Sequence, residues 1–188
     1  MASEPPLTIW TVGHSTRSSD EFLELLRSQQ IQLLVDVRRF PGSRKYPHFN
    51  EAEMARWLDA AGIGYRLAKE LGGRRTPRAD SHNTAWRNAS FRAYADYMET
   101  GEFQAAAEEL LREARMQRTA IMCSEAVWWR CHRSLIADYL KIRGVEVLHI
   151  LSPTKTEPHP FTSAASIVGG QLSYAADEGS AARQQKLF

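Results

Sequence analysis

The sequence predicts an α/β protein, a three-layer sandwich with a mostly parallel sheet that is Rossmann-like or flavodoxin-like. Short apolar runs alternate with amphipathic helical patterns along the chain, which is typical of a parallel sheet covered on both faces. The run at residues 31–37 is apolar at most positions, as expected of a strand buried on both sides. The 188 residues are 43% hydrophobic and 24% charged, which suits one folded domain with an extension.

Five strands and the helices between them follow from apolar spacing and capping residues. The expected strands are residues 8–13, 31–37, 64–67, 119–123 and 145–150. The first helix is predicted to begin at Ser18, because Glu21 three residues later completes a capping box. Further helices are expected from about Asn50, over 91–100, over 103–115, and over 131–143 with Gly144 as the stop.

The predicted domain organisation is a single α/β domain over residues 1–151, followed by an extended or partly disordered segment over 152–188. That segment is rich in Pro, Ser, Thr and Ala and shows only a short strand pattern at 171–174. The polar stretch between Gly73 and Asn88 is too long for a simple connector. Loops of that length are usually functional or disordered.

The composition excludes several classes of protein. No run of about 18 apolar residues is present, so we predict no transmembrane helix and no membrane partner. The N-terminus has neither the basic nor the apolar region of a secretory signal. The 2 cysteines are too few for a disulfide scaffold, so we expect a cytoplasmic protein with reduced thiols.

Positive charge is concentrated, although the net charge is only +2. The 24 basic residues comprise 19 Arg and 5 Lys. Residues 36–92 carry 12 basic and 6 acidic side chains, a net charge of +6, so the rest of the chain carries −4. Arginine offers phosphate or carboxylate groups a planar fork of donors. An anion-binding face is therefore expected, although a GC-rich genome would also enrich arginine.

Chemically active side chains follow the predicted strands. His14 and Ser15 follow the first strand, Asp36 lies near the end of the second, and Cys123 ends the fourth. Because ligands of open α/β sheets bind at the carboxyl ends of the strands, we expect these residues to converge at one rim.

The segment 123–133 holds both cysteines, Cys123 at a strand end and Cys131 at a helix start. A thiol at a helix N-terminus beside cationic side chains favours the thiolate, so either cysteine is a candidate nucleophile or redox group. Glu125, His132 and His14 are the candidates for proton transfer. The alternative is that both cysteines are small buried hydrophobic residues.

Three narrower interpretations of the cysteines are less favoured. A cysteine phosphatase needs a C-x5-R loop, whereas Arg130 stands seven positions after Cys123. No cofactor is predicted, because a metal site at Cys123, Cys131 and His132 would need adjacent ligands at 131 and 132. The cysteines also lack the C-x-x-C spacing of a redox pair.

Candidate substrate-binding residues follow the second strand and flank the cysteines. An acid leaving a strand, followed by arginines around a Pro-Gly turn, suits a ribose hydroxyl or a phosphate. Surface ion pairing is the alternative. The candidates are Ser15, Asp36, Arg38, Arg39, Arg44 and Arg133.

The long loop and the C-terminus point to macromolecular partners. Basic residues interleaved with aromatics can bind a phosphate backbone and stack bases, and the candidates are Arg74, Arg75, Trp86 and Arg87. The last five residues, QQKLF, resemble the peptide with which bacterial repair and replication proteins dock on the sliding clamp. Its docking residues would be Gln184, Leu187 and Phe188. An apolar terminus can equally pack on its own domain.

Several motifs together resemble the bacterial and archaeal family named domain of unknown function 488. They span about residues 8–151 in the expected order. The motifs are Thr11-Val12-Gly13-His14-Ser15, Asp36-Val37-Arg38 with Pro41-Gly42-Ser43, Leu71-Gly72-Gly73, and Met122-Cys123-Ser124-Glu125 with Cys131-His132-Arg133. The resemblance implies an α/β sandwich with a site built from these segments, and it implies no established reaction.

Three functional hypotheses remain. The leading one is an enzyme on a phosphate-bearing substrate, a nucleotide or nucleic acid, with a Cys/Glu/His/Arg site at the strand ends. The first alternative is a non-catalytic nucleic-acid-binding or DNA-repair accessory protein that docks on the sliding clamp through its C-terminus. The second is a small-metabolite enzyme whose arginines recognise a carboxylate.

Overall fold

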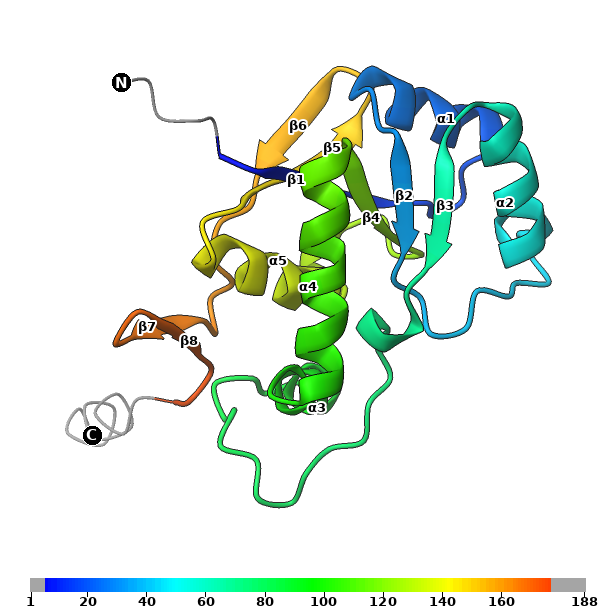
Figure 1. The fold of residues 1–188 in the computed structure, drawn as a ribbon. Helices are drawn as coiled ribbons and strands as arrows, with labels where there is room; N and C mark the ends of the chain where they lie inside the picture. The colour runs from blue at the N-terminus through cyan, green and yellow to red at the C-terminus, as the bar shows by residue number, and fades with distance from the viewer. Residues whose placement is uncertain (1–5, 177–188) are drawn as a thin grey trace, which may run out of the picture.

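The computed structural model describes residues 6–176, in which a six-stranded sheet lies between two helical layers (Figure 1). Its strands are β1 (Thr8–Gly13), β2 (Leu33–Asp36), β3 (Gly64–Leu67), β4 (Thr119–Cys123), β5 (Glu146–Ser152) and β6 (Lys155–Pro158). The spatial order is β3-β2-β4-β1-β5-β6, and every pair is parallel except β5–β6. The predicted α/β class with a mostly parallel sheet is confirmed.

Helices cover both faces of the sheet. On one face lie α1 (Ser19–Ser28) and α2 (Glu51–Ala60), and on the other lie α3 (Ala89–Met98), α4 (Gly101–Met116) and α5 (Arg133–Ile142). Each face has its own apolar core, and α4 crosses the front of the sheet in Figure 1. Among residues 6–176, no helix is both long and apolar enough for a membrane span.

The start of α1 follows from its capping residues. Glu21 donates its backbone N–H to the Ser18 hydroxyl at 3.2 Å, and Ser18 donates its backbone N–H to the Glu21 carboxylate at 2.7 Å. The helix then buries Phe22, Leu25 and Leu26 on one face. The predicted capping box is confirmed, and it fixes how the chain leaves β1.

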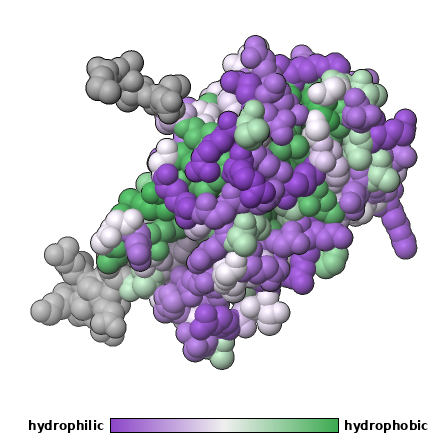
Figure 2. Space-filling view, viewed as in Figure 1, coloured by the Kyte–Doolittle hydropathy of each residue, from purple (hydrophilic) through white to green (hydrophobic). Residues whose placement is uncertain are grey.

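Residues 152–176 pack on the domain. The edge strand β6 pairs with β5, and Tyr174 is buried in the core. A hairpin of β7 (Ser166–Val168) and β8 (Gln171–Ser173) exposes Ile167 and Val168. Figure 2 shows a hydrophobic area on the left of the molecule, on the side where Figure 1 draws this hairpin. The sheet thus continues past residue 151, where the sequence pattern ends the domain, because β6 is a polar edge strand with no apolar run.

The connections make β4 a switch point of the sheet. The chain leaves β1 and β2 toward α1 and α2, but it leaves β4 toward α5 on the opposite face. Neighbouring strands whose connections leave to opposite faces open a crevice at their carboxyl ends. β4 lies between β1 and β2, so its last residue, Cys123, borders this crevice.

Candidate functional site

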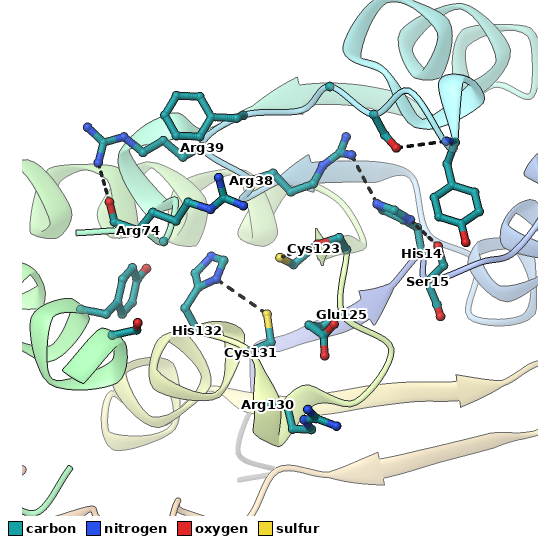
Figure 3. A pocket seen from close by; sticks show the side chains of 18 of the residues that line it. His14, Ser15, Arg38, Arg39, Arg74, Cys123, Glu125, Arg130, Cys131 and His132 are labelled. Atoms are coloured by element: carbon teal, nitrogen blue, oxygen red, sulfur yellow. Dashed lines mark hydrogen bonds between the residues drawn. The ribbon is translucent and has the colours of Figure 1, made fainter. Parts of the chain in front are cut away.

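A pocket of about 590 Å³ opens at the carboxyl ends of β1, β2 and β4 (Figure 3). Nine of the eighteen predicted site residues line it: His14, Ser15, Arg38, Arg39, Arg74, Cys123, Glu125, Cys131 and His132. Arg130 also lines it and was not among the predicted residues. Strand ends, the β2–α2 loop and the segment between the cysteines therefore build one site.

Cys123 and Cys131 lie side by side in this pocket, and both are buried free thiols. Their sulfur atoms and a ring nitrogen of His132 all lie within 4.8 Å of one another. Cys131 has an extended backbone and precedes α5, which begins at Arg133 and not, as predicted, at residue 131. The short 3₁₀ turn η3 (Trp128–Arg130) redirects the chain before the helix and brings the two sulfurs together.

The contact between the thiols drives their pKa values apart. The hydrogen bond to Cys131, together with burial, raises the pKa of Cys123 to about 12. The same hydrogen bond lowers the pKa of Cys131 to about 6 against the effect of burial, with help from the charge and the backbone N–H of Arg133. A thiol that donates to a thiolate stabilises the charged partner. Cys131 is therefore the thiolate at neutral pH, and Cys123 is its hydrogen-bond donor.

His132 is held in one tautomer. Its Nε2 lies 2.9 Å from the Val37 carbonyl oxygen, so that nitrogen donates and Nδ1 keeps its lone pair. Nδ1 lies 3.7 Å from the Cys131 sulfur (Figure 3). A Cβ at Gly73 would lie 3.1 Å from the same nitrogen, so glycine leaves room for the ring. His132 can thus accept a proton from Cys131.

The loop between the cysteines is pressed against β1. A Cβ at Gly13 would lie 1.8 Å from the Glu125 carbonyl oxygen, so only glycine permits this approach. The same oxygen accepts from the buried guanidinium of Arg133. With its backbone held, Glu125 presents an exposed side chain that lines the pocket.

Asp36 and Arg38 form a closed, buried ion pair. The Arg38 Nε and Nη2 atoms donate to the Asp36 carboxylate at 2.9 and 2.6 Å, and Nη2 also donates to the Phe49 carbonyl oxygen at 2.9 Å. Tyr65 donates to the same carboxylate at 2.8 Å. The charge of Arg38 is therefore compensated before any ligand arrives.

His14 contacts this pair. Its Nδ1 donates to the Ser15 carbonyl oxygen at 2.9 Å, and Nε2 accepts from Arg38 Nη1 at 3.3 Å. The ring stacks on Phe49 with centroids 4.2 Å apart. Burial and the charge of Arg38 lower the pKa of His14 to about 4. His14 is therefore neutral at physiological pH, and its lone pair is directed at Arg38.

Arg133, predicted to bind substrate, lies behind the pocket and not in its lining. It is 1% exposed and takes part in none of the salt bridges among residues 6–176. Its guanidinium contacts two neutral oxygens, the Glu125 carbonyl and the Thr11 hydroxyl. The anion that it stabilises is the Cys131 thiolate.

Three exposed arginines, Arg39, Arg74 and Arg130, lie at the rim. Arg39 donates to the Arg74 carbonyl oxygen at 2.8 Å. Both guanidinium groups approach the ring of Phe40, at 5.7 and 6.0 Å, and this ring is 64% exposed. Free guanidinium groups beside an exposed aromatic face suit an anion that also carries a planar group.

The remaining predicted residues lie outside the pocket lining. Arg75 donates to the Gly72 carbonyl oxygen and stacks on Tyr97 at 3.5 Å. Trp86 is half-buried against Phe91. Arg44 and Arg87 are exposed, and Gln184, Leu187 and Phe188 lie outside the described residues.

Cys123, Cys131 and His132 are also the group among residues 6–176 whose side chains are close enough to share a metal ion. Two sulfurs and an imidazole nitrogen are ligands that Zn²⁺ and other soft cations accept. The Val37 carbonyl already orients the ring with Nδ1 toward the sulfurs. A metal ion would compete there with the hydrogen bond between the thiols.

Comparison with known proteins gives one match. The family model described as "Domain of unknown function DUF488" matches residues 18–140, about two thirds of the chain. No curated protein and no solved structure matches. The matched range includes Asp36, Arg38 and both cysteines.

Proposed function

The chain belongs to the family described as domain of unknown function DUF488, and we propose that it is a cytoplasmic enzyme that uses the Cys131 thiolate on a phosphate-bearing substrate. The observation that supports this proposal is that Cys131, whose pKa is lowered to about 6, lines a pocket with three arginines at its rim. A thiolate is the nucleophilic form of cysteine, and a lowered pKa makes it available at neutral pH.

The proposed chemistry is group transfer through Cys131. The thiolate attacks an electrophilic atom of the substrate, so that a bond to sulfur forms and the bond to the leaving group breaks. The leaving group departs with that electron pair and takes a proton from water in the open pocket. Water then attacks the sulfur-bound group and gives a proton to the Glu125 carboxylate, which lines the pocket, so the product and the thiolate are released. Cys123 stays protonated throughout and donates to Cys131.

The rim supports a nucleotide as the substrate class. A phosphate fits the free guanidinium groups of Arg39, Arg74 and Arg130, which no carboxylate among residues 6–176 pairs. A base can stack on the exposed ring of Phe40. Arg38 is excluded from this role because Asp36 already holds it.

The experiment is protection of Cys131 from alkylation. The full chain is treated with iodoacetamide, and peptide mass spectrometry follows each cysteine separately. Inorganic phosphate, a nucleoside monophosphate, single-stranded DNA and acetate are added in parallel. We expect the nucleotide to slow alkylation of Cys131 most, and Arg39→Ala with Arg74→Ala to abolish the protection. Chelator-treated and zinc-loaded samples show whether a metal ion alone blocks the thiol.

Arg56→Ala is the matched control, because Arg56 is an exposed arginine of α2 outside the pocket. Protection by acetate and not by phosphate would favour the carboxylate alternative. Protection by DNA alone would favour nucleic-acid binding. The proposal fails if no anion protects Cys131, or if the nucleotide protects Cys131 in the rim variants as well as it does in the unaltered chain. A substrate identified in this way should be turned over by the Arg56→Ala variant and not by Cys131→Ser.

A further inference from the structure

Two thiols and one imidazole converge in the pocket with the spacing of a metal site. The ligand atoms of Cys123, Cys131 and His132 all lie within 4.8 Å of one another, and Figure 3 shows the two sulfurs and the ring turned toward one another. The Cys131 sulfur lies 3.7 Å from His132 Nδ1. In a tetrahedral Zn²⁺ site, bonds of about 2.3 Å to sulfur and about 2.1 Å to nitrogen place neighbouring ligand atoms roughly 3.6–3.8 Å apart. The distance between these two side chains therefore already fits an ion that both of them bind.

The backbone explains how neighbouring residues can both be ligands, although adjacent ligands at 131 and 132 disfavour the site from sequence alone. Side chains that follow one another in a strand point to opposite faces. Cys131 has an extended backbone, with φ −130° and ψ 147°, whereas His132 is helical, with φ −57° and ψ −15°. The chain changes from extended to helical between them, and this change directs both side chains at the same point.

His132 is oriented in advance, as metal-binding histidines are. Its Nε2 donates to the Val37 carbonyl oxygen at 2.9 Å, which leaves the lone pair of Nδ1 on the side of the Cys131 sulfur. Metal-binding histidines almost always donate their other ring nitrogen to a carboxylate or a backbone carbonyl. The buried ring of Tyr94 also packs on the imidazole, with centroids 5.1 Å apart. An ion would therefore bind with little reorganisation of this side chain.

The chemistry of the three ligands selects a soft divalent cation. Thiolate and imidazole bind Zn²⁺, whereas Mg²⁺ and Ca²⁺ prefer oxygen ligands. Cys123 and Cys131 are 7% and 4% exposed, so an ion bound to them is largely buried. A buried charge is costly unless it is compensated, and two thiolates neutralise one Zn²⁺. The site therefore carries no net charge of its own once it holds zinc.

The three side chains leave one coordination position open. Among residues 6–176, no further His, Cys, Asp or Glu side chain belongs to the group. All three line the pocket of about 590 Å³, so the remaining position faces the open cavity. Structural zinc sites are closed by four protein ligands, whereas sites with three keep a position for water or a substrate group. Water, or an anion attracted by the arginines of the rim, would complete the tetrahedron.

We propose that Cys123, Cys131 and His132 bind a Zn²⁺ ion, with the fourth coordination position open to the pocket. The site does not depend on the proposed function, because metal binding is measured without any substrate. Where the proposed function also holds, the two are linked, since zinc takes the electron pair of the Cys131 sulfur that would attack the substrate. The zinc-bound protein is then the inactive form, and removal of the ion releases the nucleophile.

The first test is metal titration of the reduced, metal-free full chain. Zn²⁺ is added in competition with a coloured chelator, and Co²⁺ is added in parallel and followed by its absorption spectrum. We expect one ion per chain, and a Co²⁺ spectrum with the intense d–d bands of tetrahedral coordination and a sulfur-to-cobalt charge-transfer band. No binding by the unaltered chain, or an octahedral Co²⁺ spectrum without charge transfer, would overturn the proposal.

Ligand variants assign the site. Cys123→Ser should weaken the charge-transfer band, because one thiolate is lost, and His132→Ala should weaken Zn²⁺ binding at least about 10-fold. His82→Ala is the matched control for His132→Ala, because His82 is an exposed histidine outside the pocket lining, and it should bind Zn²⁺ as the unaltered chain does. Equal affinities in the two histidine variants would mean that zinc binds elsewhere.

Gly73→Ala tests the geometry while all three ligands remain. Its Cβ would lie 3.1 Å from His132 Nδ1, so the ring must shift by a few tenths of an ångström. Metal–ligand distances tolerate only about 0.2 Å, so we expect Zn²⁺ affinity to fall about 10-fold. Gly42→Ala is the matched control, because Gly42 lines the same pocket and a Cβ there would have no neighbour within 4 Å. Equal Zn²⁺ affinities in the two glycine variants would exclude Nδ1 of His132 as a ligand.

The link to the proposed function has its own measurement. With no anion added, Zn²⁺ should protect both Cys123 and Cys131 of the unaltered chain from iodoacetamide, and a chelator should restore alkylation. Zinc that binds and leaves both thiols reactive would overturn the site. Protection by zinc, together with no protection by any anion in the metal-free chain, would establish the metal site and remove the proposed substrate.

Discussion

Two buried arginines near the carboxyl edge of the sheet, Arg38 after β2 and Arg133 at the start of α5, have opposite surroundings. Arg38 is 7% exposed and is bound bidentately by Asp36. Arg133 is 1% exposed and reaches Asp138 only through Thr11 and two histidines. The sequence predicts that both arginines bind an anionic substrate. In the structure Arg38 is already paired with Asp36, and Arg133 lies outside the pocket lining.

The difference shows what each arginine can do. A guanidinium paired directly with a carboxylate fixes the backbone and offers little net charge to a third group. A guanidinium held by neutral oxygens keeps its charge for whatever lies next to it, here the sulfur of Cys131. The pair at Asp36 therefore holds the rim, whereas the charge of Arg133 adds to the contact with Cys123 in lowering the pKa of Cys131.

The largest expected effect concerns stability. Arg38→Met leaves the Asp36 carboxylate buried and unpaired, so we expect the free energy of unfolding to fall by about 3–5 kcal/mol. Arg133→Met leaves no carboxylate unpaired and should cost clearly less, about 1–2 kcal/mol. Urea unfolding of both variants at pH 7 measures the two losses. Equal losses would mean that Arg133 has a partner equivalent to Asp36, which would remove the contrast.

The free energy of unfolding should depend on pH if Cys131 is a thiolate in the fold. Because the pKa of Cys131 in the fold, about 6, lies below that of a free thiol, the unfolded chain binds this proton more tightly and stability rises from pH 6 toward 9. The slope from one such group is at most about 1.4 kcal/mol per pH unit. Above pH 9 the sign reverses, because the pKa of Cys123, about 12, keeps its proton in the fold.

Cys131→Ser isolates this contribution. Urea unfolding at half-unit steps of pH gives the difference between the variant and the unaltered chain. That difference should widen from pH 6 to 9 and then stop widening. A difference that is constant over this range would show that Cys131 has an ordinary thiol pKa in the fold.

The sequence predicts the residues at the strand ends of this site, but it does not predict the buried polar residues behind them, for a physical reason. The strand-end rule placed Asp36 and Cys123 at one edge, because parallel strands share the direction of their carboxyl ends. His149 lies between apolar residues of β5, and His159 and Asp138 belong to other segments, so no helix or strand periodicity joins them. Their link depends on an antiparallel edge strand, β6, whose polar sequence gives no core signal.

The sequence also could not predict that the Arg133 side chain points into the core. Its neighbours in sequence suggest a ligand-binding arginine, and only the three-dimensional path of the loop 124–130 turns it inward. Gly13 reflects the path of this loop, because the Glu125 carbonyl oxygen occupies the space that a side chain at position 13 would need. A Gly in a strand before a polar turn is a signal of close backbone approach, but it does not name the segment that approaches.

A smaller effect is expected on thiol reactivity. Arg133→Met removes the cation beside Cys131, so the apparent pKa of the thiol should rise and alkylation at pH 6.5 should slow about 10-fold. Arg133→Lys keeps a positive charge without the planar guanidinium, so its alkylation rate should lie between those of the unaltered chain and of Arg133→Met. Stopped alkylation with peptide mass spectrometry separates Cys131 from Cys123. An unchanged rate in Arg133→Met would show that the contact with Cys123, and not the charge of Arg133, lowers the pKa of Cys131.

The smallest expected effects belong to the rim, whose arginines are exposed. Arg74→Ala should change the free energy of unfolding by less than about 0.5 kcal/mol, because a surface side chain leaves no buried group unpaired. The same change should weaken protection of Cys131 by a nucleotide about 3- to 10-fold, and the loss should shrink as salt rises, since exposed charges are screened. Arg56→Ala removes another exposed arginine, which lies in α2 and pairs only with the exposed Glu53, and it should alter neither quantity. If Arg74→Ala changed stability and left protection intact, Arg74 would be a structural residue and the rim would lose its proposed role in binding the nucleotide.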